Sequence, residues 1–276
     1  MAVVYSKHDD SVNHGCDWQD LGCGPGNLTK FLRAAWPDAH IVSVDSSQEM
    51  LDAGRAAAEA EGVDNVEWVK ASIEEFESKE QADVIFSNAA LHWVPDHAKL
   101  LPRVCANLAP GGVLAFQIPD TRKYGGAVGT IAQTHQANAF CGCSLFIRQA
   151  SHLLMETAAA TCGVDVSGVR IPRCEEDPGF YVEVLGRLTD GGEMGVNTWS
   201  TEYSQMLTGD NPVADYTRST GFQPMLAAAG GEGSESGAKF ESEYRKLIAE
   251  AYPKLGSGVT VFPFKRFFVV AKMADK

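Results

Sequence analysis

Asp20-Leu21-Gly22-Cys23-Gly24-Pro25-Gly26 is the stretch of sequence that decides the fold of this chain. Its glycines allow a tight turn between a strand and a helix, and they let the backbone approach a ligand closely. A second predicted strand, residues 40–44, leads into Asp45, which lies 19 residues after Gly26. An acid at that place can bind the two hydroxyl groups of a ribose. The stretch and the acid together predict a nucleoside-binding site.

The spacing of the glycines distinguishes between classes of nucleoside. A dinucleotide fingerprint requires glycine at its first, third and sixth positions, but the sixth position counted from Gly22 is Asn27. The pattern D-x-G-x-G-x-G instead resembles the first motif of the S-adenosylmethionine-dependent methyltransferases. Their cofactor has no pyrophosphate, so the following helix need not receive an anion at its N-terminus. The alternative is a turn in which the glycines serve backbone geometry alone.

Strand and helix patterns alternate through the first half of the chain. Apolar runs predict the strands, and apolar residues at helical spacing predict the helices between them. The expected strands are residues 40–44, 66–69, 82–87 and 113–118, and the expected helices are residues 27–36, 47–61 and 96–108. This order is typical of the α/β class with a doubly wound, mostly parallel, Rossmann-like sheet, here with a helical cap insertion. Ligands of such sheets bind at the carboxyl ends of the strands.

The predicted organisation divides the chain into four stretches. Residues 1–19 form an atypical N-terminal segment, because residues 16–19 lack the apolar run of a central parallel strand. Residues 20–120 form the S-adenosylmethionine-binding half of the α/β domain, residues 121–192 an insertion and helical cap, and residues 193–276 the C-terminal strands and substrate-side helices of the same domain. The later elements expected are helices at 151–162, 179–188, 212–219, 222–229 and 239–251, strands at 196–207 and 266–271, and a loop at 230–237.

The acidic composition limits the partners that the chain can attract. Its 276 residues carry a formal net charge of −13, which opposes sequence-independent binding to nucleic acid and to anionic membranes. The sequence has no run of about 18 apolar residues and no leader-like segment, so we expect neither a membrane span nor secretion. Its seven cysteines are irregularly spaced, and no standard zinc pattern relates Cys141, Cys143, Cys162 and Cys174. We expect a cytoplasmic monomer without a metal site.

Longer motifs make the resemblance to methyltransferases more specific. These motifs are residues 36–37, 88–97, 119–120, 199–203 and 262–268. Together with the glycine stretch they resemble the trans-aconitate 2-methyltransferases from about residue 20 to the end of the chain. The resemblance implies that S-adenosyl-L-methionine is the cofactor and that a small polycarboxylate such as trans-aconitate becomes a monomethyl ester. The alternatives are another carboxylate, such as a small acid or a malonyl-carrier thioester, and an inactive relative that binds the cofactor.

The implied reaction requires no general base. A carboxylic acid has a pKa near 4, so the nucleophile is already ionised at neutral pH, and the task of the protein is alignment. Cations must hold a polycarboxylate, by bidentate hydrogen bonds from arginine or by the point charge of lysine. His92 could instead fill the rim of the pocket, and Tyr203 could belong to the core. The substrate-binding candidates are His92, Trp93, Arg122, Tyr203, Arg218, Lys265 and Arg266.

The resemblance also implies a set of cofactor contacts. Asp45 would bind the ribose, Asn88 the methionine part, and Asp20 the ammonium group through water, unless Asp20 only caps a helix. Met50 would pack on the ribose or adenine, or would belong wholly to the core. Ser72 stands where many relatives have an acid for the adenine amino group. The cofactor-binding candidates are Asp20, Gly22, Cys23, Gly24, Gly26, Asp45, Ser46, Met50, Ser72, Ile73 and Asn88.

Overall fold

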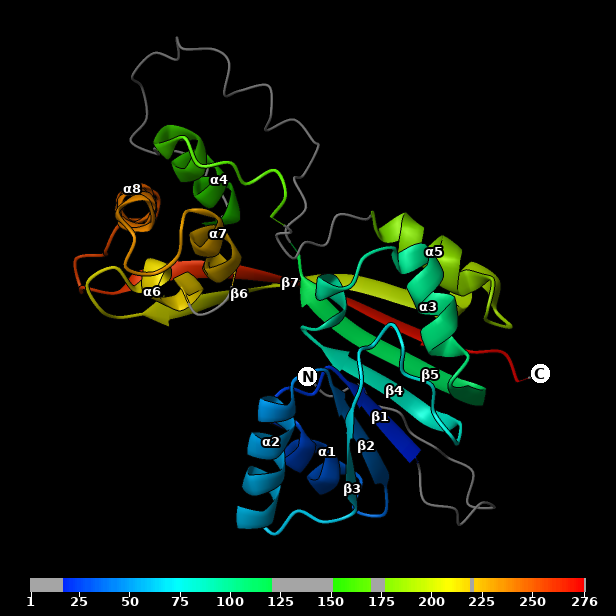
Figure 1. The fold of residues 1–276 in the computed structure, drawn as a ribbon. Coiled ribbons are helices and arrows are strands. Elements are labelled where there is room, and N and C mark those ends of the chain that lie inside the picture. Colours follow the sequence, from blue (N-terminus) through cyan, green and yellow to red (C-terminus); the bar gives the residue numbers. More distant parts are fainter. Residues whose placement is uncertain (1–16, 121–150, 170–176, 219–220, 276) are drawn as a thin grey trace. The chain divides into compact units, whose positions relative to one another are not determined.

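The computed structural model describes residues 17–120, 151–169, 177–218 and 221–275 (Figure 1). The chain divides into two compact units. The first unit comprises residues 1–120, 174–201 and 266–276, and the second comprises residues 121–173 and 202–265. Each unit is therefore built from segments that are far apart in the sequence.

A seven-stranded sheet has the strand order β3-β2-β1-β4-β5-β7-β6. Its strands are β1 (Asp17–Leu21), β2 (His40–Asp45), β3 (Val66–Lys70), β4 (Ala82–Asn88), β5 (Leu108–Pro119), β6 (Val196–Leu207) and β7 (Thr260–Lys272). β1 pairs in parallel with β2 on one side and with β4 on the other, and β4 continues in parallel to β5. β7 is antiparallel to β5. The order reverses at β1 and β4, which is where a doubly wound sheet binds its ligand.

Helices cover both faces of the sheet in the first unit (Figure 1). They are α1 (Thr29–Ala35), α2 (Gln48–Ala60), α3 (His97–Cys105) and α5 (Pro178–Gly186), with short 3-10 helices η1 (Leu91–Trp93) and η3 (Gly192–Gly195). Leu32 of α1 packs with Trp18 and Ile41 on one face. Leu101 of α3 and Tyr181 of α5 are buried on the other face. Burial of strands on both faces explains their apolar sequences.

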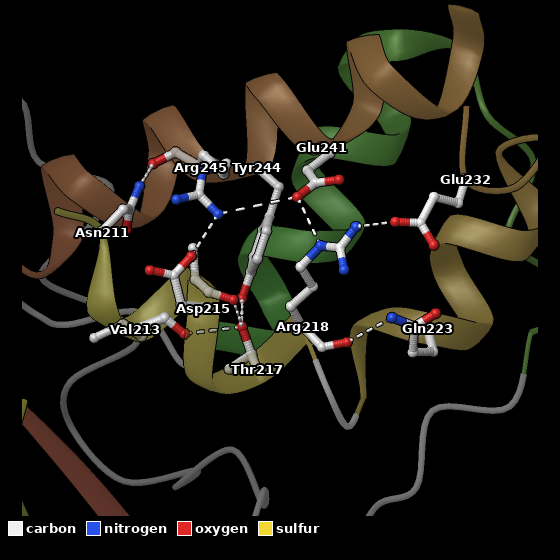
Figure 2. Close-up of polar contacts among 11 residues, drawn as sticks. Asn211, Val213, Asp215, Thr217, Arg218, Gln223, Glu232, Glu241, Tyr244 and Arg245 are labelled. Carbon is white, nitrogen blue, oxygen red and sulfur yellow. Dashed lines mark hydrogen bonds and ion pairs between the residues drawn. The ribbon is translucent and has the colours of Figure 1, made fainter. Parts of the chain in front are cut away.

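The second unit has a helical core of its own. It contains α4 (Ser151–Cys162), α6 (Pro212–Arg218), α7 (Phe222–Ala228) and α8 (Glu235–Ala251). Phe222 of α7 stacks on Phe240 and Tyr244 of α8, with ring centroids 5.0 and 4.8 Å apart. Thr217 and Tyr244 share a buried hydrogen bond of 2.8 Å between their hydroxyl groups (Figure 2). The aromatic stack and this hydrogen bond join three helices into one core.

The observed sheet confirms the predicted fold class and contains a first strand at Asp17–Leu21. β1 is short and pairs on both sides, although residues 16–19 lack the apolar run of a central strand. Trp18 and Leu21 give the strand an apolar side chain on each face, while Gln19 and Asp20 are buried as polar residues. Hydrogen bonds to two neighbouring strands hold a segment whose own pattern is weak.

Three boundaries later in the chain differ from the predictions. α8 begins at Glu235, inside the predicted loop 230–237, because the Ser234 hydroxyl accepts the Gly237 N–H at 2.9 Å and caps the helix. β5 begins at Leu108 rather than at residue 113, and β7 begins at Thr260 rather than at residue 266. The other predicted helices and strands are confirmed within a few residues.

The predicted division into residues 1–19, 20–120, 121–192 and 193–276 is functional and stays a prediction. By packing, α5 belongs to the first unit although it lies within residues 121–192. Residues 1–16 and 121–150 lie outside the described part of the chain, and so do Cys141, Cys143 and Cys174. None of the helices that the structure describes has the length and apolar character needed to cross a membrane. In the same residues, no three His, Cys, Asp or Glu side chains are grouped so that they could hold a metal ion.

Candidate functional site

The glycine stretch forms a loop between β1 and α1 that is pinned to the end of β2. The N–H groups of Gly22 and Cys23 both donate to the Val44 carbonyl oxygen, at 2.8 and 3.0 Å. Gly22 has a φ of +71°, and a Cβ added there would lie 2.2 Å from the Ala90 Cβ. Gly22 is thus required by backbone conformation and by the close approach of the turn after β4. The loop brings the ends of β1, β2 and β4 together.

Gly26 is required for a different reason. A Cβ added at Gly26 would lie 2.7 Å from the ring of Trp68, a residue of β3, and one added at Gly54 of α2 would lie 2.5 Å from the same ring. The Trp68 ring therefore packs against two glycine backbones, one in the loop and one in the helix. This packing role of Gly26 was not apparent from the sequence, where the glycine was assigned to the cofactor.

Asp45 joins the loop to the start of α2. One oxygen of its carboxylate accepts the Gly24 N–H at 2.9 Å, and the other accepts the Ser47 N–H at 2.9 Å. A carboxylate offers about four lone-pair positions, so these two bonds leave positions for further donors. Ser47 also caps α2, because its hydroxyl accepts the Met50 N–H at 3.3 Å. The carboxylate is held in one orientation before any ligand arrives.

Asp20 is a buried acid close to this loop. It is 2% exposed at the end of β1. Burial, and secondly the charge of Asp45, raise the pKa of Asp20 from 3.8 to about 7. Near neutral pH its carboxyl group is therefore poised between its two protonation states, and a cationic group bound nearby would favour the ionised one. The alternative that Asp20 caps a helix is not borne out by any described contact.

The remaining cofactor candidates on α2 and in the loops lie in the first unit, and most of them are accessible. Ser46 is exposed, and Met50 is 41% exposed, so the alternative that Met50 belongs wholly to the core is wrong. Ile73 is half-buried, with its Cδ1 3.5 Å from the position of a Cβ at Gly22. Ser72 is also half-buried and donates to Glu75 at 3.3 Å.

Cys23 is the one cofactor candidate in the loop whose side chain carries a thiol. It is half-buried, and its Sγ lies 3.5 Å from the Gly24 carbonyl oxygen. Burial, and then the charges of Asp20 and Asp45, raise the pKa of the thiol well above its usual range. The thiol is therefore protonated at neutral pH and is a poor nucleophile.

A pair of amides shapes the end of β4. The Asn88 side-chain oxygen accepts from the Gln117 amide of β5 at 2.6 Å, and the next residue, Ala89, donates its N–H to the Gln117 carbonyl oxygen at 2.9 Å. Ala89 has a φ of +55°, a left-handed conformation that a non-glycine residue seldom adopts. The NH2 group of Asn88 can donate two hydrogen bonds, so it is suited to an acceptor of a ligand. Sequence reasoning missed Gln117, although a glutamine inside an apolar strand was a signal.

A second missed residue, His97, positions the turn that carries His92 and Trp93. Its Nε2 lies 2.9 Å from the Leu91 carbonyl oxygen, and its Nδ1 lies 3.0 Å from the Tyr181 hydroxyl. His97 is 6% exposed. His92 is buried and Trp93 is exposed, with their ring centroids 5.3 Å apart. The His97 ring thus ties α3 and α5 to the 3-10 turn η1.

The substrate candidates are divided between the two units. Arg266 lies in the first unit beside Pro119, its partner in the β5–β7 register, at the edge where the parallel strands end. Lys265 and Tyr203 belong to the second unit. Tyr203 is 46% exposed, so the alternative that it belongs to the core is wrong. Arg122 lies outside the described residues.

Arg218 is already paired within the second unit (Figure 2). Its Nε donates to Glu241 at 3.0 Å, and its NH2 group donates to Glu232 at 2.7 Å. Arg245 contacts the same Glu241 oxygen at 3.9 Å and pairs with Asp215 at 2.7 Å. These charges form a network between α6 and α8. A substrate carboxylate at Arg218 would have to compete with two carboxylates of the protein.

Known proteins share both the fold and much of the sequence. Residues 19–112 match the family described as "Methyltransferase domain". The chain is 34% identical over 255 residues to the trans-aconitate 2-methyltransferase of Streptomyces avermitilis, a match that covers 91% of this chain and 83% of that protein. It is 35% identical over 254 residues to the trans-aconitate 2-methyltransferase of Mycobacterium tuberculosis, covering 92% and 84% of the two chains.

The crystal structure of the YcgJ protein of Bacillus subtilis has the same fold. Its TM-score is 0.54 at 14% sequence identity, and the match covers 96% of this chain and 95% of that one. At such low identity the likeness concerns the fold alone. The relatives from Streptomyces and Mycobacterium are far more similar in sequence, along most of the length of both proteins. This chain belongs to the family of trans-aconitate 2-methyltransferases.

Proposed function

We propose that this protein transfers the methyl group of S-adenosyl-L-methionine to one carboxylate of trans-aconitate and forms a monomethyl ester. The observation that carries the proposal is the sequence identity of about a third with trans-aconitate 2-methyltransferases over nine tenths of the chain. The loop geometry supports the cofactor half of the proposal, because the Asp45 carboxylate is fixed beside Gly24 at the carboxyl ends of β1 and β2.

In the proposed complex, Asp45 accepts both ribose hydroxyl groups at the lone-pair positions that its two backbone contacts leave open. Met50 and Ile73 pack on the adenosine, and Ser72 meets the adenine edge, with Glu75 as its hydrogen-bonded neighbour. The exposure of Met50 supports this role, since an exposed methionine beside a loop is available to a ligand. Ser46 and the backbone of the loop residues 22–26 complete the cradle.

Asp20 and Asn88 hold the methionine end of the cofactor in this proposal. The ammonium group of the cofactor, directly or through one water, stabilises the ionised form of Asp20. Cofactor binding therefore lowers the raised pKa of the Asp20 carboxyl group. The Asn88 NH2 group donates to the methionine carboxylate, and its bond from Gln117 holds the amide in place. Binding of the cofactor would therefore release a proton from the fraction of Asp20 that is protonated.

The chemistry needs no acid or base from the protein. A carboxylate oxygen of the substrate attacks the methyl carbon, the carbon–sulfur bond breaks, and the sulfonium becomes a neutral thioether. Alignment of oxygen, carbon and sulfur supplies on the order of 7 kcal/mol or more. His92 and Trp93 border the reacting groups, and His97 acts through them as a positioning residue by holding the Leu91 carbonyl. No step involves a thiol or a metal ion.

Cations hold the remaining carboxylates of the substrate. Arg266 is the foremost of these, because it lies at the edge of the first unit where the cofactor candidates also lie. Arg122, Lys265 and Tyr203 are retained as further contacts. Arg218 is the weakest candidate, since Glu232 and Glu241 already occupy its guanidinium group.

We also propose that the protein acts as a monomer in the cytoplasm, in keeping with its unpatterned cysteines.

The test combines binding with turnover in one preparation. Calorimetric titration with S-adenosylhomocysteine measures the cofactor site, and transfer of radiolabelled methyl to trans-aconitate measures the reaction. Binding with transfer is the expected result, and Arg266→Gln is expected to raise KM for trans-aconitate while leaving S-adenosylhomocysteine binding unchanged. Binding with transfer only to other di- or tricarboxylates would assign another substrate. Binding without any transfer would indicate an inactive relative, and no binding would refute the proposal.

A further inference from the structure

Trp199 of β6 forms an exposed aromatic surface in the first unit. Its ring stacks on the ring of Phe268 of β7, with the centroids 5.1 Å apart and an angle of 8° between the planes. Phe268 is 4% exposed, whereas Trp199 is 41% exposed. A buried ring therefore covers one face of the indole, and the exposed surface lies on the rest of it. A flat apolar surface held in this way can receive a second planar group.

The strand register places this ring pair in line with the cofactor candidates. Phe268 is opposite Gln117 of β5, and Gln117 is opposite Asn88 of β4. Residues directly opposite each other on neighbouring strands lie on the same face of a sheet, and Gln117 also donates to Asn88 at 2.6 Å. These residues and Trp199 thus form one row across β4, β5, β7 and β6.

Arg266 lies beside this row, closer to the edge where the parallel strands end. It precedes Phe268 by two residues on β7, so both side chains lie on the same face of the strand. Its register partner is Pro119, the last residue of β5. Neighbouring strands are about 4.8 Å apart, which places Arg266 about 10 Å across the sheet from Asn88. A small acid held by Arg266 would therefore have the cofactor candidates on one side and the Trp199 ring on the other.

A side-chain hydrogen bond anchors the segment of β6 that carries Trp199. The Ser200 hydroxyl donates to the Asp120 carboxylate at 2.8 Å, and Asp120 directly follows the end of β5. The tryptophan is thus held in two ways, by this bond of its neighbour and by the ring of Phe268. A rigid aromatic side chain offers a large contact area at little cost in conformational entropy, so it is suited to select a ligand by its shape.

We propose that Trp199 selects planar, unsaturated polycarboxylates at the substrate site, with its indole lying flat against the conjugated double bond of the acid. This inference rests on the proposed methyl transfer and adds to it a residue that distinguishes between acceptors of equal charge. Arg266 attracts any polycarboxylate, because its hydrogen bonds to carboxylate oxygens do not depend on the carbon chain. Stacking requires a flat partner, so a saturated acid with the same carboxylates gains less from the indole.

The experiment compares trans-aconitate with propane-1,2,3-tricarboxylate, the saturated acid that carries the same carboxylates. Methyl transfer gives the ratio of kcat/KM for the two acids. Calorimetric titration of the chain saturated with S-adenosylhomocysteine gives the ratio of their Kd values without turnover. Trp199→Leu removes the aromatic ring, Trp199→Phe keeps a smaller ring, and Arg266→Gln removes the charge. Phe31→Leu, which replaces an exposed aromatic side chain of α1, is the matched control, and circular dichroism checks the fold of each variant.

The wild-type chain should prefer trans-aconitate in both ratios. Trp199→Leu should lower this preference at least about fivefold, and Trp199→Phe should lower it less than about threefold. Arg266→Gln should weaken the binding of both acids to the same extent and leave their ratio unchanged. Phe31→Leu should change neither the ratio nor the affinity for either acid.

Should Trp199→Leu fail to fold, tryptophan fluorescence decides the matter. Trans-aconitate should change the fluorescence of the wild-type chain saturated with S-adenosylhomocysteine, and Trp199→Phe should lose most of this change. An unchanged ratio in Trp199→Leu with both acids still methylated, or no preference in the wild-type chain, would overturn this inference and leave the proposed function standing. Binding of S-adenosylhomocysteine without binding or methylation of either acid would overturn both.

Discussion

Replacing Asp45 with asparagine is expected to weaken cofactor binding and to loosen the glycine loop. Both oxygens of the carboxylate accept a backbone N–H, from Gly24 and from Ser47, each at 2.9 Å. Asparagine keeps one oxygen and presents an NH2 group to the second donor. One N–H therefore loses its acceptor, and one ribose hydroxyl meets a donor where it had an acceptor.

The magnitude follows from the number of bonds lost. A hydrogen bond to a charged group contributes about 1.5–3 kcal/mol. We therefore expect the free energy of unfolding to fall by about 2 kcal/mol, from the lost loop contact. Loss of the ribose contact should weaken S-adenosylhomocysteine binding by about 2–3 kcal/mol, which raises Kd roughly 30- to 150-fold.

Urea denaturation and calorimetric titration with S-adenosylhomocysteine measure the two effects separately. Asp38→Asn is the matched control, because Asp38 is an exposed acid of the same unit that precedes β2. A Kd that changes less than about threefold while stability falls would mean that Asp45 serves the loop alone, which would refute the proposed ribose contact. Unchanged stability would refute the role of its two backbone hydrogen bonds.

Three further predictions concern single residues of the first unit. Gly22→Ala should destabilise the fold by at least about 3 kcal/mol in urea denaturation, since its Cβ meets another Cβ at 2.2 Å, whereas Gly24→Ala, which meets nothing within 4 Å, should cost only about 1–2 kcal/mol; equal losses would contradict the packing. The raised pKa of Asp20 means that the folded chain holds a proton more tightly than the unfolded chain, so the free energy of unfolding should fall as pH rises from about 4 to about 7. Asp20→Asn should flatten this pH dependence between about pH 4 and 8. An unchanged slope in the variant would exclude Asp20 as the source of the dependence. His97→Phe should lower kcat for methyl transfer more than it changes S-adenosylhomocysteine affinity and should cost about 1–3 kcal/mol of stability, while Tyr181→Phe, which keeps the ring, should affect kcat less; a loss of cofactor binding alone would argue against the positioning role.

The sequence by itself determined the fold class, and it predicted the place of the cofactor site. The glycine stretch, Asp45 and the alternation of strands and helices are local patterns, and the structure has the elements nearly where those patterns predict them. Such patterns are readable because backbone conformation and apolar periodicity depend on residues close together in the chain. The weakest local pattern is that of residues 16–19, and partners on both sides rather than its own residues make β1 a strand.

Only the tertiary structure decided which side chains meet. His97 contacts Tyr181, which lies 84 residues further along the chain. Gln117 of β5 holds the side chain of Asn88 on the neighbouring strand β4. Arg218, which suited a substrate carboxylate in the sequence, is engaged by two glutamates of its own unit. These contacts join segments that are distant in the chain, and the register and packing that bring them together are properties of the folded molecule.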